Sequence, residues 1–203
     1  MANKNRVVHV MLDLETLGTA PGCAILSIGA TCFHLQEQLE HTDTEFYVAI
    51  DRNSNREIGL KEDPATLDWW NTQSKAARDA AFAKEGAIHI SSALARFSAF
   101  ISQLKADVYI WGNGADFDLP ILKAAFDTAS IPFEFSFRSS RCYRTLKALF
   151  PYVTALPIDG AIEHHAYYDA RYQAAHAEAI LNWIARFKKL ETLEICDAPR
   201  VLS

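Results

Sequence analysis

The sequence predicts an α/β fold in which helices cover a mixed sheet to form three layers. Three strand-like segments come first in the 203 residues, and helices then alternate with further strands. That order of elements is typical of a mixed sheet with helices packed against it. Half of the residues are hydrophobic and 22% are charged, which suits one globular domain over residues 1–203.

Five segments are rich in β-branched and aromatic residues, as strands usually are. The first three are separated by short polar stretches, as in an antiparallel meander. The fourth ends at Gly112, and a polar turn follows it. The predicted strands are Arg6–Leu12, Ala24–Phe33, Glu45–Ile50, Val108–Trp111 and Phe133–Phe137.

The helical segments have recognisable start signals. Asp63 and Pro64 are suited to the N-cap and first position of one helix, and Ser91 or Ser92 caps another that runs through Leu104. Of the adjacent Trp69 and Trp70, we expect one to face the core and the other an interface. The first of these helices is predicted over Pro64–Asn71, and the remaining predicted helices are Ala76–Ala83, Asp118–Ala129, Arg141–Phe150 and Ala166–Lys189.

Composition excludes several classes of protein. No apolar run approaches the roughly 18 residues of a membrane span, and the N-terminus does not resemble a signal peptide, so we expect a cytoplasmic protein without a membrane partner. The net charge of -5 argues against coating duplex DNA by bulk charge. The cysteines form no C-x-x-C pair and are expected to be reduced thiols; they are Cys23, Cys32, Cys142 and Cys196.

Four acids and a histidine follow strand ends or open a helix. Asp13 and Glu15 close the first strand, where residues i and i+2 point to the same side. Asp118 follows the fourth strand, and His164 and Asp169 stand where the last helix begins. Taken singly, each has an ordinary explanation as an exposed strand-end acid, a helix N-cap or a group that complements a helix dipole.

Taken together, these residues predict a metal site. If the strand ends and the helix start meet, the clustered carboxylates raise one another's pKa, and oxygen-preferring Mg²⁺ or Mn²⁺ ions relieve the repulsion. Two such ions about 3.5–4 Å apart bind the attacking and leaving oxygens of a phosphodiester. A histidine beside them is suited to accept a proton from the attacking water.

The motifs resemble those of the DEDDh branch of the DnaQ-like 3'-5' exonucleases, within the ribonuclease H-like superfamily. The segment MLDLET matches the strand ending in D-x-E-T, ADFD matches the aromatic–Asp pair, and HHAYYDA matches the H-x4-D motif. The stretch LDLETLGTAPGCAILSIGA is most similar to the subgroup of phage exonuclease A and the mycobacterial exoribonucleases.

The resemblance implies a five-stranded mixed sheet with helices on both sides, and removal of nucleoside 5'-monophosphates from the 3' end of single-stranded DNA or RNA. It implies two Mg²⁺ or Mn²⁺ ions held by Asp13, Glu15, Asp118 and Asp169. His164 would be the general base, although the doubled histidine leaves His165 as an alternative. Several relatives are homodimers, so the resemblance also raises homodimerisation as an expectation.

The substrate is expected to lie against the exit of the first strand. Backbone groups of Leu14, Thr16 and Leu17 would contact its sugar or base, and Leu17 would act as a wedge against the terminal base unless it simply packs in the protein. Phe117 would pack on the penultimate base, since aromatic stacking accepts any base, or else belong to the core.

The densest basic patch surrounds the predicted helix Arg141–Phe150 and consists of Arg138, Arg141, Arg144 and Lys147. Arg141 and Arg144 would share one helix face, and the patch would contact phosphates upstream of the scissile bond or else form an ordinary solvated face. Asp116 has no assigned role and competes with Asp118 as the helix N-cap. Two other functions stay open: a non-catalytic nucleic-acid-binding or scaffold protein, and an endonuclease of the same superfamily. The sequence does not distinguish DNA from RNA.

Overall fold

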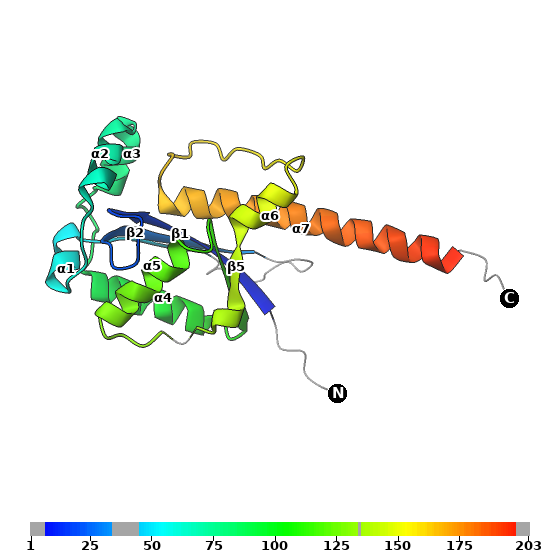
Figure 1. Cartoon of the computed structure of the whole chain (residues 1–203), viewed down its shortest axis with the longest axis horizontal. Coiled ribbons are helices and arrows are strands. Elements are labelled where there is room, and N and C mark those ends of the chain that lie inside the picture. The colour runs from blue at the N-terminus through cyan, green and yellow to red at the C-terminus, as the bar shows by residue number, and fades with distance from the viewer. Residues whose placement is uncertain (1–6, 34–44, 134, 198–203) are drawn as a thin grey trace.

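Five strands form one mixed sheet in the computed structural model, which describes residues 7–33, 45–133 and 135–197 (Figure 1). The strands are β1 (Val7–Thr16), β2 (Ile25–Phe33), β3 (Glu45–Ala49), β4 (Asp107–Gly112) and β5 (Ser140–Cys142). Their order is β3-β2-β1-β4-β5; β1–β2 and β2–β3 are antiparallel, and β1–β4 and β4–β5 are parallel. The predicted mixed five-stranded sheet is therefore confirmed, although Arg6 lies outside the described residues.

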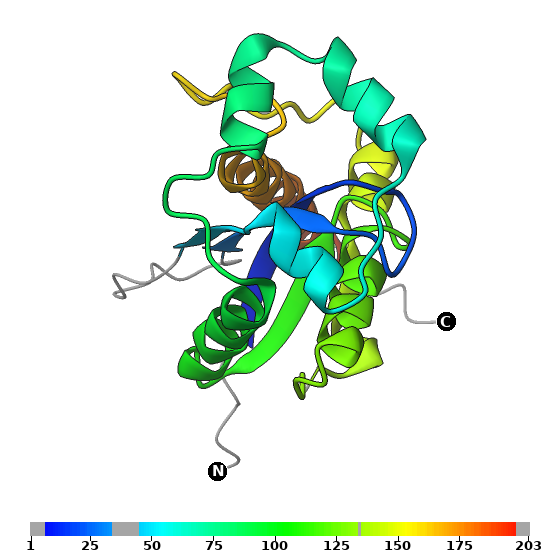
Figure 2. The ribbon, with the colours of Figure 1, turned by 90° about the vertical axis from the view of Figure 1, so that its left-hand side faces the viewer.

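Helices cover both faces of this sheet. They are α1 (Arg52–Glu57), α2 (Pro64–Thr72), α3 (Lys75–Ala81), α4 (Ile90–Gln103), α5 (Asp118–Thr128), α6 (Tyr143–Leu149) and α7 (Ala166–Asp197). In Figure 1, α4 and α5 lie below the sheet and α6 and α7 above it. Figure 2 shows α7 almost end-on, with α2 and α3 above it. None of the helices in the described ranges has both the length and the hydropathy to cross a membrane.

The alternation of β1 places four of its apolar residues on one face and its two acidic residues on the other. Val8, Val10, Leu12 and Leu14 belong to the large core shared with α4 and α5. Met11 belongs instead to a smaller core on the α7 side, with Trp111, Tyr143, Ala174 and Ala177. Because side chains alternate along a strand, Asp13 and Glu15 continue the Met11 row toward α7.

The fifth strand was predicted in the wrong place. The rings of Phe133 and Phe135 pack against the large core, and Phe133 stacks on Phe126 with 4.3 Å between ring centroids. The strand that pairs with β4 is instead Ser140–Cys142, which follows a 3-10 turn at Phe137–Ser139. Aromatic residues are common in strands, but here burial of their rings took precedence over pairing of their backbone.

Helix starts also differ in part from the prediction. Asp63 caps α2 as expected, but α4 begins at Ile90, two residues earlier than a Ser91 cap allows, because His89 is its N-cap and His89 Nδ1 accepts from Ser91 N. The predicted helix Arg141–Phe150 begins only at Tyr143, after β5. Helix α1 was not predicted at all, since its six residues carry no apolar periodicity.

Candidate active site

Three carboxylates from distant parts of the chain meet beside β1. Asp13 and Glu15 project from its α7 side, and Asp169 lies in the first turn of α7. Ligand oxygens of these three residues all lie within 4.8 Å of one another. The structure thus brings together three of the four acids that the sequence predicted as one site.

Gly29 allows α7 to begin this close to the sheet. It is the cross-strand partner of Asp13 on β2. A Cβ atom at position 29 would lie 2.1 Å from the Ala166 carbonyl oxygen and 2.6 Å from Tyr167 N, which no packing can accommodate. The missing side chain therefore lets the first turn of α7 cross β2 and carry Asp169 to the acids of β1.

Asp118, the fourth predicted acid, lies next to this group but faces the backbone. Its side chain is only 1% exposed. Oδ1 accepts from Leu14 N at 3.2 Å and Oδ2 accepts from Asn113 N at 2.8 Å. Asp118 is therefore not the side-chain cap of α5, and Asp116 is not either, since α5 has no side-chain cap hydrogen bond. The carboxylate of Asp118 instead joins the ends of β1 and β4.

Burial raises the pKa of all four acids, and repulsion within the group adds to it at Asp13 and Glu15. Burial raises the pKa of Asp13 most, and the charges of Asp118 and Glu15 add to it. Burial, followed by the charges of Asp169 and Asp118, raises the pKa of Glu15 to about 8. Burial raises the pKa of Asp118 to about 6, although the hydrogen bonds from two backbone N–H groups lower it. Burial also raises the pKa of Asp169, although the charge of His164 lowers it. Such a site favours an added cation.

Two amide side chains complete the polar lining. Gln173 lies one turn after Asp169 on α7, and its Nε2 donates to Asp13 Oδ1 at 2.7 Å. Gln173 Oε1 and Asn113 Oδ1 are buried without a hydrogen-bond partner among the described residues. An all-oxygen donor set with unpaired buried oxygens fits a hard divalent cation such as Mg²⁺ or Mn²⁺.

The two adjacent histidines have different surroundings. His164 has a positive φ of 56° and lines the same cavity as Asp13, Glu15 and Asp169. Its ring meets Trp69 edge-on with 4.9 Å between centroids. His165 stacks instead on Tyr47 at 4.7 Å, and burial lowers its pKa. Of the two, His164 is the one that borders the acids.

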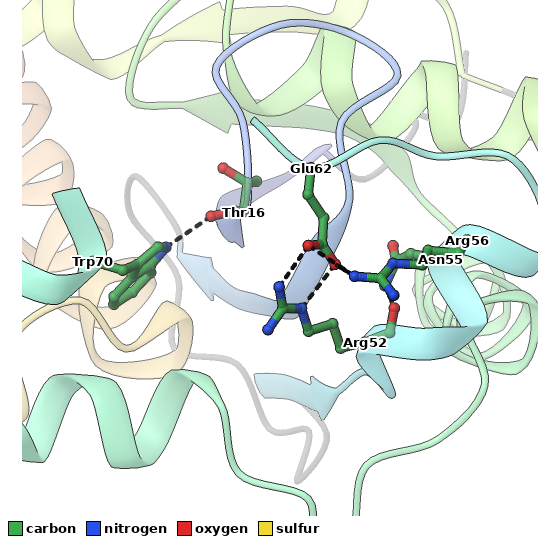
Figure 3. A network of polar contacts seen from close by, with 6 residues as sticks. All are labelled: Thr16, Arg52, Asn55, Arg56, Glu62 and Trp70. Carbon is green, nitrogen blue, oxygen red and sulfur yellow. Dashed lines mark hydrogen bonds and ion pairs between the residues drawn. The ribbon is translucent and has the colours of Figure 1, made fainter. Parts of the chain in front are cut away.

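Helix α2 forms the opposite wall and is tied to the exit of β1. Trp70 is 1% exposed, and its Nε1 donates to Thr16 O at 2.9 Å (Figure 3). Asp63 N, just before α2, donates to Leu17 O at 2.7 Å. Trp69 is 43% exposed and lines the cavity. Trp70 is therefore the predicted core tryptophan, whereas Trp69 lies at the surface and its place at an interface stays a prediction.

A second network in Figure 3 holds the segment between β3 and α2. Asn55 of α1 is fully buried, and its side chain accepts from Ile25 N at 2.9 Å and donates to Ile25 O at 3.0 Å. Glu62 accepts from Arg52 through both carboxylate oxygens and pairs with Arg56 at 3.2 Å. These contacts anchor the chain on both sides of α1 and so support the position of α2.

The cavity bounded by β1, α2, α6 and the start of α7 has a volume of about 670 Å³. Leu14 and Thr16, which were predicted to contact the substrate through their backbone, line this cavity. Phe117, which was predicted to stack on a base, lines it as well. Leu17 does not fit its predicted role, because it is 0% exposed and belongs to the large core. Its N–H donates to Ala24 O and its carbonyl accepts from Asp63, so its backbone groups are also paired within the protein.

The two predicted arginines do not share a helix face. Arg141 lies in β5, where its guanidinium stacks 4.0 Å from the Tyr109 ring centroid. Arg144 is exposed on α6, next to Gly114, and its charge lowers the pKa of Asp118. Only Arg144 is therefore near the acids. Asp116 is exposed.

Several cavity residues were not predicted from the sequence. Gln173 had a usable signal, since it follows Asp169 by four positions on one helix face. Lys147 was noted only as part of a basic patch, and Tyr143 and Tyr172 carried no local signal. All four line the cavity.

Comparison with solved structures shows a shared fold. The nuclease domain of 3'hExo, a DEDDh family member bound to rAMP, matches with a TM-score of 0.54 at 9% identity, over 92% of this chain and 95% of that one. Pop2p of S. pombe, in a form with bound Mg²⁺ and Mn²⁺, matches with a TM-score of 0.51 at 12% identity, over 93% and 85%. Cell-death related nuclease 4 (CRN-4) matches with a TM-score of 0.52 at 11% identity, over 89% and 64%. The chain therefore has the fold class of these structures, which include a nuclease domain of the DEDDh family.

Sequence comparison narrows this class to a family. The chain belongs to the family of Rv2179c-like 3'-5' exoribonuclease domains, whose model matches residues 8–181. It is also similar to the exodeoxyribonuclease of Enterobacteria phage T4, with 24% identity over 122 residues. That match covers 55% of this chain and 52% of the phage protein, so the chain spans about half the length of this curated relative. The predicted resemblance is confirmed.

Proposed function

We propose that this protein is a metal-dependent 3'-5' exonuclease that removes nucleoside 5'-monophosphates from single-stranded nucleic acid. The observation that carries the proposal is the meeting of Asp13, Glu15 and Asp169 within 4.8 Å in a cavity that His164 also lines. The family match supports the direction of cleavage. A cavity of about 670 Å³ is in the size range of small-ligand sites and suits the end of a single strand.

Asp13, Glu15 and Asp169 would hold the metal, and Asp118 would complete the set by turning from its backbone donors. When bound, two Mg²⁺ or Mn²⁺ ions would supply positive charge to the attacking and leaving oxygens of a phosphodiester. Gln173 orients Asp13 through its 2.7 Å hydrogen bond. The raised pKa values of Asp13 and Glu15 support this assignment, since a cation at this point removes the repulsion that raises them.

His164 would be the general base that accepts a proton from the attacking water. Its imidazole borders the carboxylates, and the Trp69 ring restricts its orientation from the α2 side. Imidazole is a common general base, and the neighbouring carboxylates would be engaged by cations when metal is bound.

The walls of the cavity would hold the 3'-terminal nucleotides. Trp69, Tyr172 and Phe117 line it and offer ring faces to bases, which suits a low sequence preference. Leu14 and Thr16 lie at the β1 exit, where backbone groups are in reach of a sugar. Arg144, exposed beside Gly114, would meet a phosphate at the mouth.

The test uses single-stranded DNA and RNA oligonucleotides of matched sequence, labelled at either end, with Mg²⁺, Mn²⁺ or chelator. We expect a ladder that shortens from the 3' end, release of 5'-monophosphates and full inhibition by chelator. Asp13→Ala should abolish the ladder because it removes a principal ligand. Cleavage of circular single-stranded DNA would instead indicate an endonuclease, and specific binding without any cleavage would indicate a scaffold.

The adjacent histidines provide a matched control. His164→Ala should lower kcat by about 10²–10⁴-fold, the usual contribution of a general base. His165→Ala should lower it far less, since His165 packs on Tyr47 outside the cavity lining. The reverse order of effects would assign the base to His165.

A further inference from the structure

The cavity is strongly acidic for a site that would take a polyanion. Among the described residues that line it, four are carboxylates: Asp13, Glu15, Asp63 and Asp169. Lys147 of α6 is the single lysine or arginine among those same residues. Since the whole chain has a net charge of -5, a bound strand depends on local cations for its phosphates.

Lys147 packs on an aromatic ring that a chain of partly buried hydrogen bonds holds in place. Its Nζ lies 5.0 Å from the centroid of the Tyr143 ring. Tyr143 is buried, and its hydroxyl lies 2.7 Å from His176 Nδ1, while His176 Nε2 lies 2.7 Å from Val153 O. A carbonyl only accepts, so His176 Nε2 carries a hydrogen, and Nδ1 is hydrogen-bonded to the Tyr143 hydroxyl. The ring that supports the ammonium group is therefore fixed on both sides.

Lys147 lines the cavity, but its ammonium group forms no ion pair with the acid group. In the described part of the chain, no carboxylate oxygen lies within 4.0 Å of Lys147 Nζ, whereas Arg52, Lys75 and Lys123 all have such partners. The scissile phosphate has to lie at Asp13, Glu15 and Asp169, where the cutting takes place. A cation set apart from them on another wall is suited to a different phosphate of the same strand.

We infer that Lys147 binds the phosphate that precedes the scissile one and thereby makes the enzyme prefer a strand over a single nucleotide. The inference rests on the proposed exonuclease function. A charge-assisted contact of this kind contributes roughly 1.5–3 kcal/mol, which is about 10–150-fold in affinity. Lys147 is accordingly a positioning residue for the substrate, and its contribution requires a substrate with at least two phosphates.

The kinetic test compares two substrates. The p-nitrophenyl ester of thymidine 5'-monophosphate has only the scissile diester, whereas a ten-residue oligothymidylate has phosphates upstream of it. Lys147→Gln should raise KM for the oligonucleotide at least tenfold with little change in kcat. The loss of kcat/KM on the ester should be at least ten times smaller than the loss on the oligonucleotide. Lys147→Arg should restore most of the loss. Lys123→Gln, a surface lysine paired with Asp127 on α5, is the matched control and should behave as wild type.

Three kinetic results would overturn the inference: an equal loss on both substrates, an unchanged KM for the oligonucleotide, or Lys147→Arg as impaired as Lys147→Gln. A binding measurement keeps the test separate from catalysis. The measurement uses the Asp13→Asn variant in chelator and a fluorescently labelled oligonucleotide, whose affinity is plotted as log affinity against log salt concentration. Lys147→Gln should make the slope of this plot shallower by about 0.7. An unchanged slope also overturns the inference. If wild type cuts neither substrate, the proposed function fails, while this slope still tests Lys147.

Discussion

Glu15 belongs to the candidate active site, but its ionised form destabilises the folded protein. Its pKa is raised from 4.5 to about 8, mainly by burial. The folded state therefore holds the Glu15 proton more tightly than the unfolded state. This contribution to stability is fully present below pH 4.5 and is lost as the pH rises through about 8.

From this sign we predict that Glu15→Gln stabilises the metal-free protein in alkaline solution. In chelator at pH 9, its Tm should exceed that of wild type by about 5 °C, since roughly 2 kcal/mol corresponds to such a shift in a chain of this size. The difference should shrink toward pH 5, and nuclease activity should be lost. Scanning calorimetry across this range provides the measurement; a difference independent of pH would mean that packing, not charge, causes it.

At the scale of single elements, α2 links the exit of β1 to the cavity wall. Trp70 anchors the helix through Thr16 O, and its neighbour Trp69 faces His164. Trp70 therefore attaches the helix to β1, and Trp69 contacts the cavity. The rotation of α2 about its axis determines which of the two indoles faces the core.

We therefore predict opposite outcomes for the two tryptophans. Trp70→Phe should lower the free energy of unfolding by about 1–2 kcal/mol, because it leaves the buried Thr16 carbonyl without this donor. Trp69→Ala should change it by less than about 1 kcal/mol but lower kcat/KM about tenfold, since a stacking surface contributes roughly 1–3 kcal/mol per base. Urea unfolding and the oligonucleotide assay measure the two effects. Equal losses of stability would contradict the division.

Elements differed in how far the sequence revealed them. Long periodic segments such as α4, α5 and α7 were predicted, because many residues contribute to one pattern. The short β5 and α1 were not, since Ser140–Cys142 and Arg52–Glu57 depend on neighbours that are distant in sequence. The acids were predicted by their motifs, whereas the contributions of Lys147 and Gln173 depend on how α6 and α7 pack. Homodimerisation stays a prediction.

At the scale of the whole molecule, the acid group connects the middle of the sheet with the first turn of α7. Metal bound there should stabilise the entire fold, since it binds the folded state and not the separated segments. Because cations and protons compete for the same carboxylates, the effect should grow with pH.

We predict that millimolar Mg²⁺ or Mn²⁺ raises Tm more at pH 8 than at pH 5.5. Asp13→Asn should reduce the increase, and Asp127→Asn, which alters a surface ion pair on α5, should retain it. Thermal unfolding monitored by tryptophan fluorescence measures both variants. An equal increase in the two would place the metal elsewhere.

The close approach of Ala166 to Gly29 has a consequence for the tolerance of this protein to mutation. Any larger residue at position 29 displaces the helix that carries Asp169, so folded yield and turnover should decline together in a saturation library. At positions 13 and 15 the same two screens should diverge, with abundant but inactive variants. Selection for abundance alone would therefore preserve Gly29 but would not preserve Asp13 and Glu15 on the neighbouring strand.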